Sequence, residues 1–448
     1  MVGPNYKPPQ EPVPQVWSSS TATQPAQLTN WWTKFNDEKL NSLIVRALAT
    51  NLDLKIAESR VRQARAERGI VAGGFWPGVD ATGSYRHQHT GGNYPVSGDM
   101  YQAGLDASWE IDIFGGVRRN IEAAEADIAA SVEQRRAVLV SLTAEVALNY
   151  FNLRGYQQQL AIANENIAAQ ERSAALTRKR FPAFASKLEV ANADALVATT
   201  RAALPVLESA ARQTIFALSV LLAREPAALS GELEAAAPLP LTPPEVPVGL
   251  PSDLLRRRPD VRAAEAAIHG ATARIGVATA DLFPKFSLTG SIGTSSTTGS
   301  GLVNWNNRVY AFGPSISWNL FSAGSTLAKI EAQNEAEQQA LLTYRKTVLT
   351  ALGDVEGALV AYIKEQQHRE RLAAAVAANK EAVELATRLY TEGQTDFLNV
   401  LSAQRALFSV QDALVQSQRN VATDLLAIYK ALGGGWENEP PIPPRDNR

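Results

Sequence analysis

Three carboxylates lie close together in the chain, at Asp106, Glu110 and Asp112. Paired carboxyl groups are the acid and base of glycoside hydrolases, so this cluster is a candidate for catalysis. His87 and His89 are two residues apart, but a zinc site needs a third ligand, and the sequence suggests none. The glycine-rich segment Gly290–Gly301 lacks the Lys-Ser/Thr pair of a P-loop. The histidines and the glycine-rich segment therefore predict no metal site and no cofactor. No pocket signature accompanies the carboxylates, so we expect no enzyme.

The segment that carries the carboxylates alternates between apolar and polar residues. Period-two alternation places the two sets on opposite faces of a strand. Carboxylates are costly in a dry core, so we expect Asp106, Glu110 and Asp112 to line a water-filled passage. The apolar set is Tyr101, Ala103, Leu105, Ala107, Trp109, Ile111 and Ile113, and the polar set is Gln102, Gly104, Asp106, Ser108, Glu110 and Asp112.

The chain contains an internal repeat that aligns residues 40–114 with residues 247–321. In both copies a helix-like segment ends at an aromatic-Pro stop and is followed by alternating segments and a very long helix-like segment. A repeat of this size predicts two structural halves with the same architecture. The first copy's landmarks, Asp53, Glu58, Gly69, Pro77 and Phe114, coincide with Asp260, Glu265, Gly276, Pro284 and Phe321.

The repeat predicts five regions. Residues 1–35 form an extended N-terminal segment, and residues 36–223 form the first repeat, with a strand pair at about 78–113 and a helical hairpin at about 116–222. A Pro-rich connector (224–251) leads to the second repeat (252–436), with a strand pair at about 285–320 and a hairpin at about 323–432. A tail (437–448) ends the chain.

The predicted hairpins have apolar residues every seven positions, for example Val132, Leu139 and Val146, and then Val400 and Leu407. This repeat predicts left-handed coiled-coil packing. At about 1.5 Å per residue, a helix of 65 residues spans on the order of 100 Å. Such helices are far longer than an ordinary globular domain needs.

Composition narrows the class of protein. The formal net charge of −2 gives no basic surface for nucleic acid. The absence of cysteine excludes disulfides and thiolate metal sites and is consistent with an exported protein. No run reaches the roughly 18–20 apolar residues of a membrane helix. A soluble coiled-coil adaptor of the periplasm, or a structural rod, is therefore the alternative to a membrane protein.

The four predicted strands are long enough to cross a bilayer at a tilt. Four strands cannot close a barrel, and open strand edges are not tolerated in lipid. Two chains would supply eight strands, and side chains fill the interior of an eight-stranded barrel. Three chains would supply twelve strands, and a barrel of that size leaves a passage. We therefore expect a homotrimer. Tyr101, Trp109, Tyr310 and Trp318 are candidates for the aromatic belts at the membrane interfaces, with ordinary packing as the alternative.

Six motifs occur together along the chain. They are "VGPNYKPP" (2–9), "WEIDIFGGVRR" (109–119), "GLPSDLLRRRPDVRAAE" (249–265), "DLFPKFSLTGSIG" (281–293), "LNVLSAQRALF" (398–408) and "YKALGGGW" (429–436). In this order and spacing the chain resembles the TolC superfamily of outer-membrane channel proteins, in its OprM/NodT-like lipoprotein branch. Met1 stands where that branch carries its acylated cysteine.

The resemblance implies a TolC-like fold of mixed α and β structure. A trimeric twelve-stranded barrel would lie in the outer membrane of a Gram-negative bacterium, above a twelve-helix tunnel in the periplasm. It implies the passive exit duct of a tripartite multidrug efflux pump, with a periplasmic adaptor and an inner-membrane transporter as partners. The family's periplasmic gate corresponds to Leu398, Ser402 and Arg405. Ser402 replaces the usual Asp, so Arg405 is expected to pair elsewhere, for example with Asp396 or Asp412.

Overall fold

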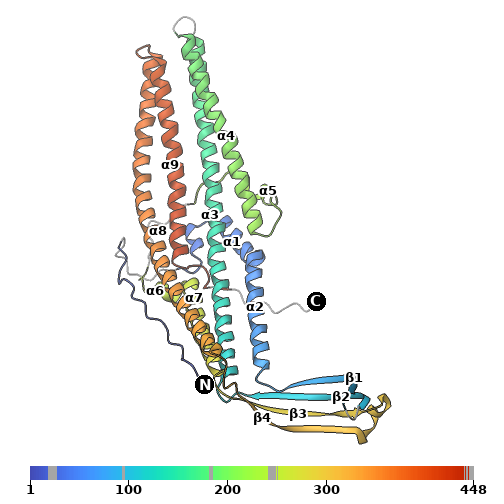
Figure 1. Ribbon diagram of the computed structural model, residues 1–448. Coiled ribbons are helices and arrows are strands. Elements are labelled where there is room, and N and C mark those ends of the chain that lie inside the picture. Colours follow the sequence, from blue (N-terminus) through green and yellow to red (C-terminus); the bar gives the residue numbers. More distant parts are fainter. Residues whose placement is uncertain are drawn as a thin grey trace. The chain divides into compact units, whose positions relative to one another are not determined.

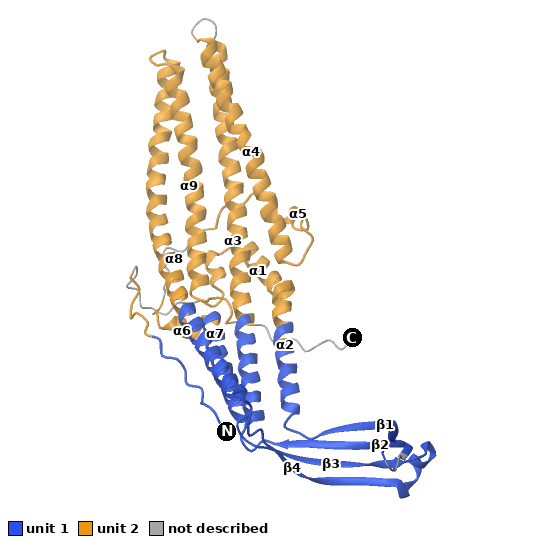
Figure 2. Ribbon diagram, in the orientation of Figure 1, with its two compact units in different colours: residues 1–11, 59–134, 260–347 blue, residues 12–58, 135–259, 348–448 orange. Residues whose placement is uncertain are grey.

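The computed structural model describes residues 1–18, 28–92, 96–180, 185–240, 249, 251–437, 439 and 442. The chain divides into two compact units (Figure 2). Unit 1 contains Met1–Glu11, Ser59–Gln134 and Asp260–Thr347, and unit 2 contains Pro12–Glu58, Arg135–Pro259 and Val348–Arg448. Each unit takes segments from both sequence repeats, so the units do not coincide with the repeats.

The internal repeat is visible in the order of the elements (Figure 1). In the first copy, helix α2 (Leu52–Gly73) leads into strands β1 (Gly78–Thr90) and β2 (Val96–Ile111). In the second copy, α7 (Pro259–Ala280) leads into β3 (Lys285–Ser296) and β4 (Arg308–Ser317). Helices α2 and α7 both contain 22 residues and end just before their aromatic-Pro stops.

Each strand pair is followed by a long helical hairpin. The first is α3 (Gly116–Arg180) with α4 (Lys187–Leu221), and the second is α8 (Ser325–Thr391) with α9 (Phe397–Ala431). The mixed fold of strand pairs and long hairpins predicted from the sequence is confirmed. None of the helices in the described ranges is both long enough and apolar enough to span a membrane. The short elements are η1 (Trp31–Phe35), α1 (Glu38–Thr50), α5 (Ser230–Leu233), α6 (Asp253–Arg257), η2 (Gly299–Val303) and η3 (Trp305–Asn307).

The hairpin turns are set by local hydrogen bonds. Helix α4 begins with a capping box, in which Ser186 and Glu189 each bond the other's backbone N–H. Helix α8 ends at Thr391, and Gly393, two residues further on, has a φ of +74°. The Gln394 N–H then reaches back to the carbonyl of Leu389 at 2.9 Å, a glycine-dependent helix stop. The turn of the first hairpin, residues 181–184, lies outside the described residues.

The strands of unit 1 form one antiparallel sheet in the order β1-β2-β3-β4 (Figure 1). Several strand ends differ from the sequence prediction. Strand β2 begins at Val96 rather than near Tyr101, and β3 continues to Ser296, beyond the loop start expected at Gly293. Strand β2 ends at Ile111 rather than near residue 113, and β4 ends at Ser317 rather than near residue 320. The added residues at the first two ends are mostly Gly, Ser and Thr, which have little strand preference of their own. They are strands here because the ladders with neighbouring strands reach that far, as in the pairing of Thr90 with Val96.

The core of unit 2 is aromatic around Trp31. Its ring stacks on Tyr429 at 5.1 Å and meets Phe35 edge-on at 6.2 Å. The "GGGW" segment passes over this core, and Gly435 has a φ of +106°. A Cβ on Gly435 would lie 3.3 Å from Trp31 Nε1, so the close approach and the backbone angle both require glycine.

A fully buried arginine also stabilises unit 2. The Arg135 guanidinium donates to Glu58 Oε1 at 3.0 Å and also binds Glu439, close to the end of the described chain. Glu439 in turn accepts from Arg136 Nε at 2.8 Å. Burying a cation is costly unless it is paired, so Arg135 depends on both carboxylates.

Replacing Arg135 by alanine is expected to leave Glu58 and Glu439 without their buried partner and to destabilise the protein by about 3–5 kcal/mol. The Arg136→Ala variant is the matched control, because it loses a partly exposed ion pair with the same Glu439 and a contact with the Trp436 ring at 4.7 Å, and it should cost about 1–2 kcal/mol. Thermal unfolding followed by circular dichroism in detergent measures both. Equal losses in the two variants would contradict the role given to the buried charge.

Candidate functional site

One face of the sheet in unit 1 is apolar across all four strands. The ladders place Ala81, Leu105, Ile292 and Tyr310 in one continuous row. A second row contains Val79, Ala107, Gly290 and Phe312. These side chains are not covered: Leu105 is 49% exposed, Ile292 52% and Phe312 83%. A contiguous exposed apolar surface of this kind marks contact with lipid or with another protein.

The other face of the sheet is polar. Asp80, Asp106 and Ser291 form one row, and Glu110, Ser287 and Ser315 form another. Asp106 and Glu110 are exposed, and Asp106 accepts a hydrogen bond from Thr82 Oγ1 at 2.8 Å. These two carboxylates share the face predicted from the alternation, and this face can remain in water while the opposite one is dehydrated.

Asp112 differs from the prediction. It lies one residue beyond β2, and its carboxylate accepts hydrogen bonds from the backbone N–H groups of Val117 and Arg118 and from Arg118 Nε, at 3.0–3.1 Å. Its side chain is only 7% exposed. Burial opposes ionisation, but the bonds from Arg118 and Val117 outweigh it and hold the pKa of Asp112 below its ordinary value. Asp112 therefore caps the start of α3 instead of extending the wet face of the strand.

The four candidate interface aromatics divide into two pairs. Tyr101 packs on Tyr85 at 4.9 Å, and Tyr310 is 70% exposed. Trp109 Nε1 donates to the carbonyl of Phe75 at 3.0 Å, and Trp318 Nε1 donates to the carbonyl of Leu282 at 3.0 Å. The two tryptophans thus bind the two aromatic-Pro stops in the same way. Sequence reasoning missed this role, although the shared position of the stops in the repeat pointed to it.

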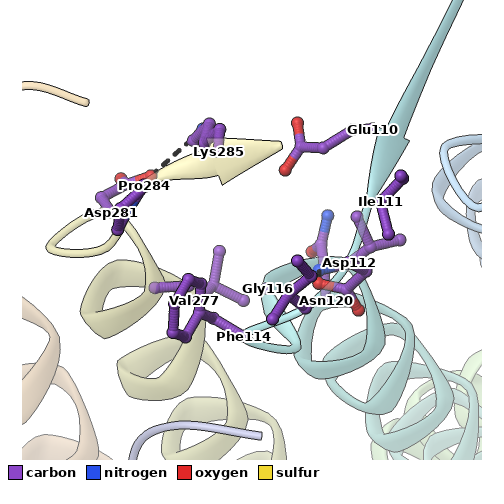
Figure 3. A pocket seen from close by; sticks show the side chains of 13 residues that line it. Glu110, Ile111, Asp112, Phe114, Gly116, Asn120, Val277, Asp281, Pro284 and Lys285 are labelled. Carbon is purple, nitrogen blue, oxygen red and sulfur yellow. Dashed lines mark hydrogen bonds and ion pairs between the residues drawn. The ribbon is translucent and has the colours of Figure 1, made fainter. Parts of the chain in front are cut away.

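A pocket of about 200 Å³ lies where the sheet of unit 1 meets the helices (Figure 3). Asp281 and Lys285 enter it from the α7–β3 connection, whereas Glu110 and Asp112 come from β2 and the turn after it. Burial of Asp281 opposes its ionisation, but Lys329 at 2.6 Å and Lys285 at 3.4 Å outweigh it and hold the pKa of Asp281 below its ordinary value. Asp281 is thus paired with two lysines and Asp112 with Arg118, and the described lining offers no nucleophile with an adjacent base.

The histidine candidate is explained by one carboxylate. His87 Nδ1 lies 2.7 Å from Asp99 Oδ1, which also accepts from the Tyr85 hydroxyl at 3.0 Å. Over the described ranges, no group of three His, Cys, Asp or Glu side chains is placed to hold a metal ion. Met1 lies against the start of α3, where a Cβ on Gly115 would be 2.9 Å from the Met1 Cα.

The tips of the two hairpins in unit 2 meet in a small core. Phe397, Val400 and Leu401 of α9 pack in it with Tyr390 and Leu196. Arg180, at the end of α3, donates to the carbonyls of Tyr390 and Thr391 and lies over the Tyr390 ring at 4.9 Å. A cation at the C-terminal end of α8 is favoured by the helix dipole. One face of α9 is therefore held firmly at the tip.

Leu398, Ser402 and Arg405 lie on a different face of α9. All three are exposed, and Leu398 is 61% exposed. No ion pair joins Arg405 to another residue in the described ranges. Asp412, one of the partners expected for it, instead accepts from Gln159 Nε2 and Gln416 Nε2 at 2.7 Å.

The first hairpin provides an internal comparison for this face. Leu188 is the second residue of α4, as Leu398 is the second residue of α9, and it is 68% exposed. Counting along α4 from Leu188, the positions of Ser402 and Arg405 are occupied by Asn192 and Ala195. The exposed leucine is thus common to both hairpins, whereas the cation occurs only in the second.

Comparison with known proteins identifies a family and relatives of nearly the same length. The family model described as outer membrane efflux protein matches residues 43–224 and 250–434, one stretch in each repeat. The chain is 34% identical over 448 residues to the probable efflux pump outer membrane protein TtgC of Pseudomonas putida, covering 97% of this chain and 92% of the relative. It is 31% identical over 444 residues to nodulation protein T of Rhizobium leguminosarum bv. trifolii, covering 97% and 94%. The solved structure of the outer-membrane channel OprN has a TM-score of 0.91 at 36% identity and covers 97% of this chain and 99% of that chain.

The Asp112→Ala variant is expected to lose about 1–2 kcal/mol of stability at neutral pH, because three hydrogen bonds to the start of α3 disappear. Since the pKa of Asp112 is lowered in the folded state, its contribution is present above the unfolded pKa of about 3.9 and is lost as the pH falls through the lower folded value. The gap between wild type and variant should therefore shrink on acidification to about pH 3. Unfolding midpoints across this range measure it, with Asp106→Ala as the control, and a gap independent of pH would exclude the charged cap.

Proposed function

Because the chain belongs to the outer membrane efflux protein family, we propose that it is one subunit of the exit duct of a tripartite efflux pump. The duct lies in the outer membrane and conducts small molecules passively. Its residues bind no cofactor and carry out no reaction. A soluble adaptor or rod would not account for exposed rows of apolar residues that cross all four strands of the sheet.

The open sheet is the observation that carries this proposal. Every residue of β1 is exposed, and β1 and β4 each have one neighbour in the order β1-β2-β3-β4. An edge strand in lipid leaves its N–H and C=O groups unpaired, at several kcal/mol each. Pairing β4 of one copy with β1 of the next removes every edge when three copies close a barrel of twelve strands. Asp106 and Glu110 then face the water inside, and the apolar face contacts lipid.

The exposed face of α9 at the tip is the proposed gate. Leu398 narrows the passage where three copies of the second hairpin come together, and Ser402 and Arg405 lie beneath it on the same helix face. The anchored face of α9 supports this assignment, because Phe397, Val400 and Leu401 fix the helix while the three gate residues are exposed. Arg405 then finds its partner on a neighbouring copy.

The partners follow from the same arrangement. A periplasmic adaptor contacts the helix tips, and an inner-membrane transporter supplies the cargo. Contact with the adaptor favours the open arrangement of the tips, so opening is a shift between two populations and needs no chemical step. Drugs and other small molecules are the class of cargo, in line with the efflux pump named for the relative TtgC.

Replacing Leu398 and Arg405 together by alanine is expected to raise the leak conductance of the channel severalfold in planar bilayers, because the narrowest part of the passage loses bulk and charge. Leu188→Ala is the matched control, since Leu188 occupies the same position in the first hairpin and is equally exposed. Its conductance should equal that of the wild type. A double variant with unchanged conductance would exclude this gate.

The chain contains no cysteine, so pairs introduced by mutation report contacts between copies. Thr82→Cys in β1 combined with a cysteine at Ala311, Gly313 or Ser315 of β4 should give covalent dimers and trimers on oxidation, because neighbouring strands bring Cβ atoms within reach of a disulfide. Thr82→Cys with Ser291→Cys is the control, since β3 is not an edge strand. Monomers for every β1–β4 pair, or ladders beyond the trimer on denaturing gels, would contradict a closed ring of three.

A further inference from the structure

The motif at residues 2–9 is not used by the channel function, yet it makes the densest set of specific contacts at the start of the chain. We call residues Val2–Tyr6 the strap. All of its contacts described below lie within unit 1, on helices α3 and α7. The Val2 N–H donates to the carbonyl of Phe114 at 3.0 Å, which places the strap at the turn before α3.

A buried guanidinium donates hydrogen bonds to backbone carbonyls of the strap. Arg119 is 2% exposed, and its Nε donates to the carbonyl of Val2 at 3.1 Å. Its Nη2 donates to the carbonyl of Gly3 at 3.4 Å and to Asn5 Oδ1 at 2.7 Å, while Nη1 binds Glu122 at 2.7 Å. Hydrogen bonds from a charged donor are stronger than those between neutral groups. The strap thus satisfies donors of a buried cation that Glu122 alone does not fill.

The side chain of Tyr6 makes the second set of contacts. Its ring stacks on His269 at 4.4 Å, and its hydroxyl donates to Glu265 Oε1 at 3.1 Å. Burial and the nearby carboxylate raise the pKa of Tyr6, so the hydroxyl stays protonated as a donor. His269 Nε2 lies 3.1 Å from Glu122 Oε1, which connects this set to the Arg119 set.

Close packing requires glycine both in the strap and in helix α7. A Cβ on Gly3 would lie 2.5 Å from the Cα of Gly276, and the φ of Gly3 is +81°. A Cβ on Gly276 would lie 2.8 Å from Cγ of Arg119. The strap, α7 and Arg119 therefore stack in direct contact. Pro4 fixes one backbone angle of the strap, which lowers the entropy lost on docking.

We propose that Arg119, Glu122, Glu265, His269 and Gly276 form a peptide-binding site, which the chain's own strap occupies, and which binds a separate peptide of the same sequence when that strap is weakened. The ligand class is a short Gly-Pro-Asn-Tyr peptide. Every contact between the site and the strap is a hydrogen bond, a ring contact or a steric fit. None of these contacts depends on the covalent link between the strap and the rest of the chain. The proposal is independent of the transport function.

The test uses the full-length protein in detergent with Asn5→Ala and Tyr6→Ala combined, the strap variant. The probe is the acetylated peptide of residues 2–9, labelled on Lys7, which is exposed. Fluorescence anisotropy should show saturable binding to the strap variant. Wild type should bind at least about tenfold more weakly, because its own strap competes at a local concentration of about millimolar. The same peptide with Gly3→Ala is the matched control and should not bind.

Two further variants locate the site. Adding Arg119→Met to the strap variant should abolish peptide binding. If that chain does not fold, Glu265→Gln in the strap variant should weaken binding severalfold through the loss of the Tyr6 contact. Helix content and particle mass must match wild type in each chain that is titrated. A folded strap variant that shows no saturable binding up to millimolar peptide, or that binds the alanine-containing peptide equally well, would overturn the proposal.

Discussion

The rest of the structure depends on the need of every strand to pair its backbone groups where water is absent. The sheet of unit 1 meets this need inside the chain through three ladders, but no further strand of the described residues pairs with the outer edge of β1 or of β4. Apolar side chains on one of its faces are also exposed. In the proposed assembly, joining the strand edges of neighbouring copies removes both deficits. A single folded subunit therefore leaves both its outer strand edges unpaired and its apolar side chains exposed.

The two sequence repeats each supply one strand pair of this sheet, but the two pairs differ in the charges they carry. The ladder between β2 and β3 joins the two repeats, and Trp109 and Trp318 repeat one hydrogen bond at the two aromatic-Pro stops. The charges have diverged, however. The carboxylates of the polar face lie in the first repeat, at Asp80, Asp106 and Glu110, whereas β3 contributes Lys285.

Periodicity was enough to predict the strand pairs, the hairpins and the two faces, because period two and period seven are properties of single segments. What failed depended on contacts between segments. Asp112 continues the alternation in the sequence, but β2 ends at Ile111. The carboxylate instead accepts hydrogen bonds from backbone N–H groups at the start of α3. The start of β2 was missed because its residues form a strand only beside β1. In the sequence, Arg119 is recognisable only as part of the motif at 109–119. Its burial could not be predicted from that motif, because it depends on contacts with both α7 and the strap.

Helix α9 separates the exposed surface that carries the proposed gate residues from the surface that holds the helix in place. Toward α3 it is held by directional polar pairs, with Gln159 on Asp412, Asn166 on Gln411 and Ser173 on Gln404, each at 2.7–2.8 Å. Such pairs contribute only about 0.5–1.5 kcal/mol each, but they fix the register of two helices more strictly than apolar contacts do. Leu398 and Arg405 take no part in them. Substitutions on the exposed face can therefore change the surface of α9 without shifting the helix that carries it.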